Sequence, residues 1–158
     1  MKLNAQDLGK IVNPTLEHYN QHAEEFWAGT CDHDVSQNIA TMLQYMPRFT
    51  ILDFGCGPGR DLKVVAELGH IAVGLEGAAH FADTARAYSG CEVWQQDFLK
   101  LDLPDNHFDG VFANAALFHV PSQELPRVLL ELHENRNRCL VHGDRHGEVL
   151  ARGMWAYR

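Results

Sequence analysis

The sequence predicts an α/β protein with a Rossmann-like, doubly wound and mostly parallel sheet. Three observations support this prediction: short apolar runs alternate with amphipathic stretches, glycines directly follow the first run, and polar residues follow the later ones. Strands that alternate with helices form right-handed βαβ units, whose parallel strands are covered by helices on both faces. Ligands bind such sheets beyond the carboxyl ends of the strands.

The first 47 residues are predicted to be helical and polar. Residues 15–27 and 35–45 can each form a helix, and Asp34 or Ser36 can cap the second one. The pattern changes at residues 49–54, a short apolar run with β-branched and aromatic members that ends at glycines. Such a run is typical of a buried parallel strand that enters a tight loop.

The rest of the chain repeats this alternation. Its helical stretches place apolar residues on one face, and Gly69 closes the first of them. The predicted strands cover residues 71–75, 92–95, 108–113 and 139–142, and the predicted helices cover residues 61–68, 78–88 and 125–132. The residues that directly follow each strand are therefore where we expect a ligand site.

Charge and composition exclude several classes of protein. Thirteen basic against 21 acidic side chains give a formal net charge of −8, which argues against a nucleic-acid partner because phosphate binding needs a basic face. No apolar run reaches the length of a membrane span, and the first residues contain no apolar signal core. We therefore expect a cytoplasmic protein without a membrane partner.

The cysteines and histidines do not form a recognisable metal site. The four cysteines lie far apart and contain no CxxC pair, so we interpret them as free thiols. Two histidine pairs, His18–His22 and His142–His146, have helical spacing but lack the glutamate or cysteines of a zinc motif. We predict solvated histidines and no metal.

The loop Gly55-Cys56-Gly57-Pro58-Gly59 is the strongest local signal. Glycines allow positive φ in a sharp turn and let a ligand lie close to the backbone. A dinucleotide-binding loop reads GxGxxG, whereas Arg60 stands where the last glycine of that motif belongs. The spacing favours a smaller nucleoside without a pyrophosphate.

Two acidic residues at later strand ends complete the expected site. Glu76 ends the second strand, where a carboxylate can accept hydrogen bonds from both ribose hydroxyls. Asp97 follows the third strand, where it can accept a hydrogen bond from an adenine amino group.

Four segments in register resemble the motifs of class I S-adenosylmethionine-dependent methyltransferases of the small-molecule type. Residues 51–61 resemble the first motif, and residues 73–76 resemble the ribose-binding strand end. Residues 96–98 resemble the adenine-contacting segment, and residues 108–121 resemble the fourth strand and its exit in methyltransferases of the ubiquinone-biosynthesis and tellurite-resistance type. The resemblance covers residues 15–134 and implies an enzyme that transfers a methyl group from S-adenosylmethionine to a small-molecule acceptor.

The resemblance also implies roles for individual residues. Asp53 and the glycines would lie near the methionine end of the cofactor, Glu76 would hold the ribose, and Asn114 would provide a backbone platform beside the methionine. Tyr19 matches an aromatic residue that covers the cofactor from the amino-terminal helix. The full set of expected cofactor-binding residues is Tyr19, Asp53, Gly55, Cys56, Gly57, Gly59, Glu76, Gly77, Asp97, Phe98 and Asn114.

His119 follows the fourth strand and is the candidate catalytic residue. A general base assists methyl transfer when the acceptor carries a proton of high pKa. The alternative is a structural histidine that bonds a neighbouring loop. Residues 30–34 are a candidate for part of a substrate lid, with a capped helix start as the favoured interpretation, and Trp27 can line an apolar pocket or simply pack.

The sequence departs from the family pattern after His133. We therefore expect a single domain with N-terminal helices (1–47), a cofactor-binding core (48–134) and an atypical tail (135–158), in which the sheet is truncated at its C-terminal edge. An unpaired edge favours a homodimer. Two other functions stay open: a catalytically impaired S-adenosylmethionine-binding module, and an NAD-linked oxidoreductase fragment, which Arg60 disfavours.

Overall fold

The chain folds around one six-stranded sheet. The computed structural model describes residues 2–45, 50–134, 139–143 and 149–153. The strands are β1 (Thr50–Phe54), β2 (Ile71–Glu76), β3 (Glu92–Gln95), β4 (Gly110–Asn114), β5 (Cys139–Gly143) and β6 (Val149–Gly153), in the spatial order β3-β2-β1-β4-β5-β6. Every neighbouring pair is parallel except β5 and β6, which are antiparallel. The predicted fold class is confirmed.

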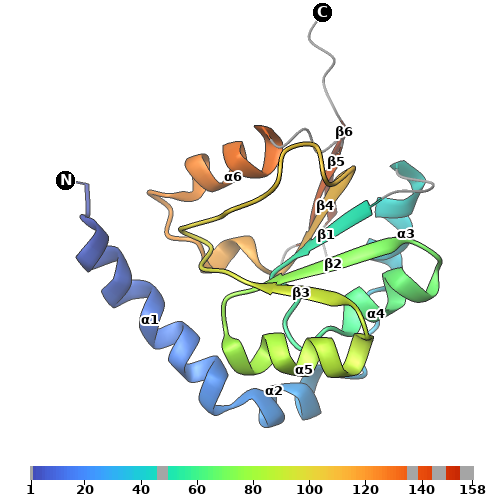
Figure 1. Cartoon of the computed structure of the whole chain (residues 1–158), viewed down its shortest axis with the longest axis horizontal. Coiled ribbons are helices and arrows are strands. Elements are labelled where there is room, and N and C mark those ends of the chain that lie inside the picture. Colours follow the sequence, from blue (N-terminus) through green and yellow to red (C-terminus); the bar gives the residue numbers. More distant parts are fainter. Residues whose placement is uncertain (1, 46–49, 135–138, 144–148, 154–158) are drawn as a thin grey trace, which may run out of the picture.

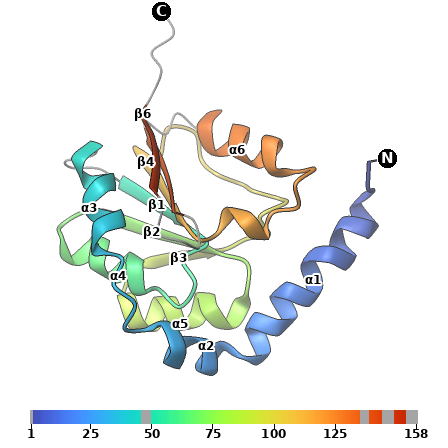
Figure 2. The same cartoon turned by 180° about the vertical axis from the view of Figure 1, so that it is seen from behind.

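Helices cover both faces of the sheet (Figures 1 and 2). The helices α3 (Ser36–Tyr45), α4 (Arg60–Glu67) and α5 (Ala79–Ser89) lie on one face, and α6 (Leu125–Glu134) lies on the other. The strands alternate accordingly: Ile51 and Phe112 belong to the apolar cluster under α3–α5, whereas Leu52 and Val111 belong to the cluster under α6. This two-residue period is what a parallel sheet buried on both faces requires.

Two further helices precede the sheet and lie near its carboxyl end. The carboxyl-terminal part of the long helix α1 (Ala5–Gln21) contacts α5, and α2 (Ala23–Thr30) follows after a break at His22 (Figure 1). The sequence predicted one helix over residues 15–27, and this prediction is wrong at both ends. Asn4 accepts a hydrogen bond from the Asp7 N–H and caps α1 ten residues earlier, and Pro14 lies inside the helix without ending it.

The other predicted elements agree with the structure to within a few residues. The fourth strand begins at Gly110 rather than residue 108, and the short 3₁₀ turn η1 (Leu117–His119) follows it. The strand β6 was not predicted, so the sheet extends one strand beyond the fifth. The tail lies partly outside the described residues, as does His146 of the predicted histidine pair.

Glycine at position 74 allows the helix α4 to pack closely on the sheet. A Cβ atom there would lie 2.8 Å from the Cys56 Sγ and 3.0 Å from the Leu62 Cδ2. Gly74 is paired with Asp53 in the parallel register, directly below the loop that joins β1 to α4. The close packing therefore sets the position of that loop and of the residues at the start of α4.

Candidate functional site

A cavity of about 310 Å³ lies at the carboxyl ends of the strands, under α1 and α2. This volume is at the lower end of the range for small-molecule sites. All the predicted site residues line the cavity except Asp53 and Gly59. Ten of the twelve predicted site residues therefore lie around one cavity.

The glycine loop forms one wall of the cavity. Gly55, Gly57 and Gly59 have φ values of +73°, +53° and +92°, which glycine adopts far more readily than other residues. A Cβ atom on Gly55 would collide with the Ala116 side chain, and one on Gly59 would lie 2.8 Å from the Ala85 Cα. At Gly57 a Cβ atom would meet nothing within 4 Å, so this glycine is open toward the cavity. The open side of Gly57 is where a ligand can contact the backbone.

The Glu76 carboxylate lies directly beside this open glycine. Its Oε2 accepts a hydrogen bond of 2.9 Å from the Gly57 N–H, and its Oε1 accepts one of 2.9 Å from the Ala78 N–H. The side chain is 6% exposed, and this burial raises the pKa of the Glu76 carboxyl above its ordinary value, while the backbone N–H groups oppose the rise. The Glu76 carboxylate therefore points toward the glycine loop.

Asp53 lies beside the cavity rather than on its surface. It is 3% exposed, and its Oδ2 has no hydrogen-bond partner within the described part of the chain. Burial, followed by the nearby charges of Asp61 and Glu76, raises the pKa of the Asp53 carboxyl well above its ordinary value. The position of Asp53 therefore does not favour direct contact with a ligand.

A chain of hydrogen-bonded polar side chains lies at one end of the cavity. The Arg60 Nε donates to the Asp61 Oδ1 at 2.7 Å, and the Asn114 Nδ2 donates to the Asp61 Oδ2 at 3.0 Å. The Asn38 Nδ2 in turn donates to the Asn114 Oδ1 at 3.1 Å. The sequence analysis treated Arg60 only as a missing glycine and did not assign Asp61 or Asn38 at all.

The opposite end of the cavity is formed by the segment after β3. The Asp97 Oδ1 accepts a 2.9 Å hydrogen bond from the Leu99 N–H, and the Phe98 ring packs on Phe54 with the ring centroids 4.4 Å apart. Both Asp97 and Phe98 line the cavity. An aromatic face and a fixed carboxylate are groups that can recognise an adenine ring.

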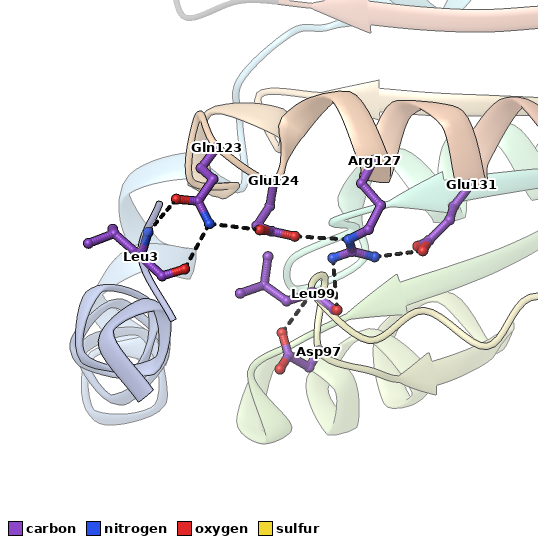
Figure 3. A network of polar contacts seen from close by, with 7 residues as sticks. All are labelled: Leu3, Asp97, Leu99, Gln123, Glu124, Arg127 and Glu131. Atoms are coloured by element: carbon purple, nitrogen blue, oxygen red, sulfur yellow. Dashed lines mark hydrogen bonds and ion pairs between the residues drawn. The ribbon is translucent and has the colours of Figure 1, made fainter. Parts of the chain in front are cut away.

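Arg127 on α6 bonds the backbone of this segment (Figure 3). Its Nη2 donates to the Leu99 carbonyl at 2.9 Å, and its other donors bond Glu124 and Glu131 at 2.9 and 2.6 Å. Gln123, beside Glu124, exchanges two hydrogen bonds with the backbone of Leu3, which lies just before α1. The network therefore links the start of α1 to the loop that carries Asp97.

Tyr19 and His119 meet across the cavity. The Tyr19 Oη lies 3.2 Å from the His119 Nε2, and the two rings make an edge-to-face contact with centroids 5.4 Å apart. Tyr19 also packs against Phe26 and Phe81, so the cavity wall near His119 is aromatic. The pair joins α1 to the turn that follows β4.

The candidate lid segment contributes two residues to the cavity, Thr30 and His33. The favoured alternative also agrees with the structure, because the Asp34 Oδ1 accepts a 2.9 Å hydrogen bond from the Ser36 N–H at the start of α3. Trp27 lines the same cavity. Its ring packs on Tyr88 with the centroids 4.6 Å apart, so Trp27 both lines the cavity and packs against a neighbouring side chain.

No group of three or more histidine, cysteine, aspartate or glutamate side chains within the described ranges is arranged to hold a metal ion. Of the helices that the structure describes, none combines the length and apolar character that crossing a bilayer requires.

The fold and the site together define a Rossmann-like α/β domain with a mostly parallel sheet, an open glycine loop after β1 and a carboxylate at the end of β2. Residues 51–137 match the family described as methyltransferase domain. This chain belongs to that family, and the sequence-based recognition is confirmed.

Curated relatives agree with this membership. The chain is 29% identical over 117 residues to sterol 24-C-methyltransferase from Yarrowia lipolytica, covering 68% of this chain and 30% of that protein. It is 32% identical over 93 residues to 24-methylenesterol C-methyltransferase 2 from Oryza sativa, covering 54% and 26%. The chain thus spans about a third or less of the length of these relatives.

Solved structures show the same fold. Phosphoethanolamine N-methyltransferase 1 from Haemonchus contortus superimposes with a TM-score of 0.74 at 16% identity, covering 90% of this chain and 33% of that one. A TehB-like methyltransferase from Corynebacterium glutamicum gives a TM-score of 0.65 at 21% identity, covering 87% and 78%. At these identities the likeness concerns the fold alone.

The buried carboxyl of Asp53 predicts a pH-dependent loss of stability. Below the unfolded pKa of about 4, the Asp53 carboxyl is protonated in both the folded and the unfolded state, so its raised pKa does not affect stability. As the pH rises above that value, the free energy of unfolding falls. The loss is complete above the raised pKa of the folded state. In thermal unfolding between about pH 5 and pH 8, Asp53→Asn should gain melting temperature relative to the wild type as the pH rises.

The exposed Asp83 on α5 gives a matched control, because Asp83→Asn should differ from the wild type by a constant amount over the same range. If the difference in melting temperature between Asp53→Asn and the wild type is constant as well, the raised pKa of the Asp53 carboxyl is contradicted.

Proposed function

We propose that this chain binds S-adenosylmethionine over residues 55–59 and transfers its methyl group to a small-molecule acceptor. The observation that carries the proposal is the buried Glu76 carboxylate, which bonds the Gly57 N–H beside the open side of that glycine. A carboxylate in this position suits ribose hydroxyls, and the free space over Gly57 suits a nucleoside. Membership of the methyltransferase family supports the same ligand.

The residues around the cavity fit this cofactor better than a dinucleotide. Asp61, Glu76 and Asp97 line the cavity, and an acidic wall favours a cationic sulfonium over a pyrophosphate. Arg60 stands at the position of the third dinucleotide glycine and pairs with Asp61. Together with the family match, these features weigh against an NAD-linked oxidoreductase, and the family match favours methyl transfer over a binding module without catalysis.

When bound, the cofactor supplies a methyl group already activated by a positively charged sulfur. The main task of the protein is then to hold the acceptor on the axis of the methyl group, and such positioning can be worth roughly 7–11 kcal/mol. The glycine loop, Glu76 and the Asp97–Phe98 segment would fix the cofactor, with Gly77 and the backbone at Cys56 and Asn114 completing its surroundings. The aromatic wall formed by Tyr19, Phe26 and Phe81 would contact the acceptor or cover the cofactor.

His119 is the candidate general base in this proposal. Its Nε2 lies 3.2 Å from the Tyr19 Oη, so Tyr19 can fix the ring orientation and receive or return a proton. The alternative, a structural role for His119, rests on the same contact, because the pair also ties η1 to α1. Removal of the His119 side chain should lower kcat at unchanged cofactor affinity if His119 is the general base. It should leave kcat unchanged if its role is structural.

Relatives suggest the class of acceptor without fixing it. The relatives are named as sterol methyltransferases and one structural neighbour as a phosphoethanolamine methyltransferase, and both names denote small-molecule acceptors. We therefore propose a small-molecule acceptor and no particular compound. A homodimer through the sheet edge, which β6 forms, and a cytoplasmic location also stay predictions.

Calorimetric titration with S-adenosylhomocysteine tests the proposed cofactor site. The wild type should bind S-adenosylhomocysteine. Glu76→Ala should bind it about 100-fold more weakly, because the two proposed hydrogen bonds from the ribose hydroxyls to the Glu76 carboxylate are lost. Glu67→Ala, which removes an exposed carboxylate on α4, should leave the affinity unchanged. Equal affinity of wild type and Glu76→Ala would remove Glu76 from the site, and tighter binding of NAD would favour the oxidoreductase.

Transfer of a labelled methyl group to a panel of small phenols, amines and thiols tests the catalytic role. For an acceptor that is turned over, His119→Ala should lower kcat about 100-fold or more while affinity for S-adenosylhomocysteine changes less than about twofold. Tyr19→Phe should shift the pH profile of kcat. His80→Ala, on α5, should leave kcat unchanged.

An unchanged kcat in His119→Ala would assign this histidine a structural role. Binding of S-adenosylhomocysteine without transfer to any acceptor in the panel would favour the impaired binding module.

A further inference from the structure

The turn that follows β3 belongs to no helix or strand, although three of its residues line the cavity: Asp97, Phe98 and Leu99. Two short hydrogen bonds shape the turn from within. The Leu99 N–H donates to the Asp97 Oδ1 at 2.9 Å, and the Lys100 N–H donates to the Asp97 carbonyl at 2.8 Å. Bonds within the turn do not fix its position relative to the rest of the site.

Arg127 on α6 supplies a bond from outside the turn. Its Nη2 donates to the Leu99 carbonyl at 2.9 Å, and among the described residues it is the only hydrogen-bond partner of residues 97–101 from another element. Leu99 is therefore bonded at both of its backbone groups, at the carbonyl by Arg127 and at the N–H by Asp97. A shift of the Leu99 backbone would also shift the Asp97 carboxylate.

The guanidinium of Arg127 is held in place by its own helix (Figure 3). Its Nε bonds Glu124 at 2.9 Å and its Nη1 bonds Glu131 at 2.6 Å, about one turn of α6 on either side. Gln123 donates to the other Glu124 oxygen at 3.2 Å. Although the Arg127 side chain is 39% exposed, a guanidinium with three partners on three nitrogens is confined more than a single surface pair. It is thus aligned in advance with the Leu99 carbonyl.

The orientation of the Asp97 carboxylate matters for the choice of base. The Leu99 N–H occupies Oδ1, and within the described part of the chain Oδ2 accepts no hydrogen bond, so it can accept one from a ligand. A carboxylate oxygen accepts a hydrogen bond from the exocyclic amino group of adenine. It repels the carbonyl oxygen that hypoxanthine carries at the same position. The direction of Oδ2 therefore determines how well the two bases are distinguished.

We propose that Arg127 is a positioning residue for recognition of the adenine base, acting from α6 through the Leu99 backbone on the Asp97 carboxylate. Arg127 does not line the cavity, so it acts without touching the cofactor. The inference rests on the proposed function and deepens it, because selectivity for the base then depends on a side chain outside the cavity.

Two ligands that differ only in the base test the proposal. S-adenosylhomocysteine carries adenine, whereas S-inosylhomocysteine carries hypoxanthine, with an oxygen in place of the amino group. Both are titrated calorimetrically into the wild type, Arg127→Met and Arg86→Met. Arg86 on α5 is the matched control, because it pairs with Asp83 and donates two hydrogen bonds to the Val93 carbonyl. That carbonyl belongs to β3, which its pairing with β2 holds in place independently.

The wild type should bind S-adenosylhomocysteine about tenfold or more tightly than S-inosylhomocysteine, as expected for one hydrogen bond to a charged group. Arg127→Met should reduce this ratio to less than about threefold, mainly by weakening S-adenosylhomocysteine. Arg86→Met should keep the wild-type ratio. Arg127→Lys, which keeps the charge but loses the planar fork, should give an intermediate ratio.

If Arg127→Met does not fold, Glu124→Gln should lower the ratio in the same direction by a smaller factor, because it removes one of the two charges that hold the guanidinium. A wild-type ratio in the folded variant would overturn the proposal, whether both affinities stay unchanged or fall together, since Arg127 would then only stabilise the fold. A wild type that does not distinguish the two ligands would overturn it as well. A wild type that binds neither ligand would instead contradict the proposed function itself, so the two failures are distinguishable.

Discussion

The hydrogen bond from the Gly57 N–H to the Glu76 carboxylate connects the ends of two neighbouring strands. It holds the loop after β1 against the end of β2, at a residue whose positive φ glycine adopts more readily than other residues. The rest of the site is arranged around it: the start of α4 follows the loop on one side, and the segment with Asp97 lies beyond β2 on the other. Without this contact the cavity would lose a defined wall.

The same region concentrates carboxylates at a cost. Burial raises the pKa values of the Asp53 and Glu76 carboxyls, and the charges of Asp61 and Glu76 raise that of Asp53 further. Asp61 pairs with Arg60 and accepts a hydrogen bond from Asn114. Such an arrangement is unfavourable for folding and favourable for a cationic ligand. The apolar packing on both faces of the sheet offsets that cost, and Gly74 brings α4 close enough for the acidic residues to meet.

Local patterns were sufficient to predict the alternating strands, the glycine loop and the position of Glu76, because each is determined by residues close together in sequence. The contacts of Arg60 with Thr30 and of Asn114 with Asn38 could not be predicted, because these partners lie 30 and 76 residues away along the chain. The early start of α1 depends on a single cap at Asn4, and Pro14 lies inside this helix. The strand β6 could not be predicted, because the sequence of the tail shows no clear two-residue period of apolar residues.

The central claim is that Glu76 holds the sugar of a nucleoside whose backbone contact is Gly57. A crystal structure of the complex with S-adenosylhomocysteine measures this most directly. The account predicts a Glu76 carboxylate oxygen within about 3 Å of a ribose hydroxyl, with the ligand lying over Gly57. A ligand bound elsewhere, or a ribose directed away from Glu76, would contradict the claim.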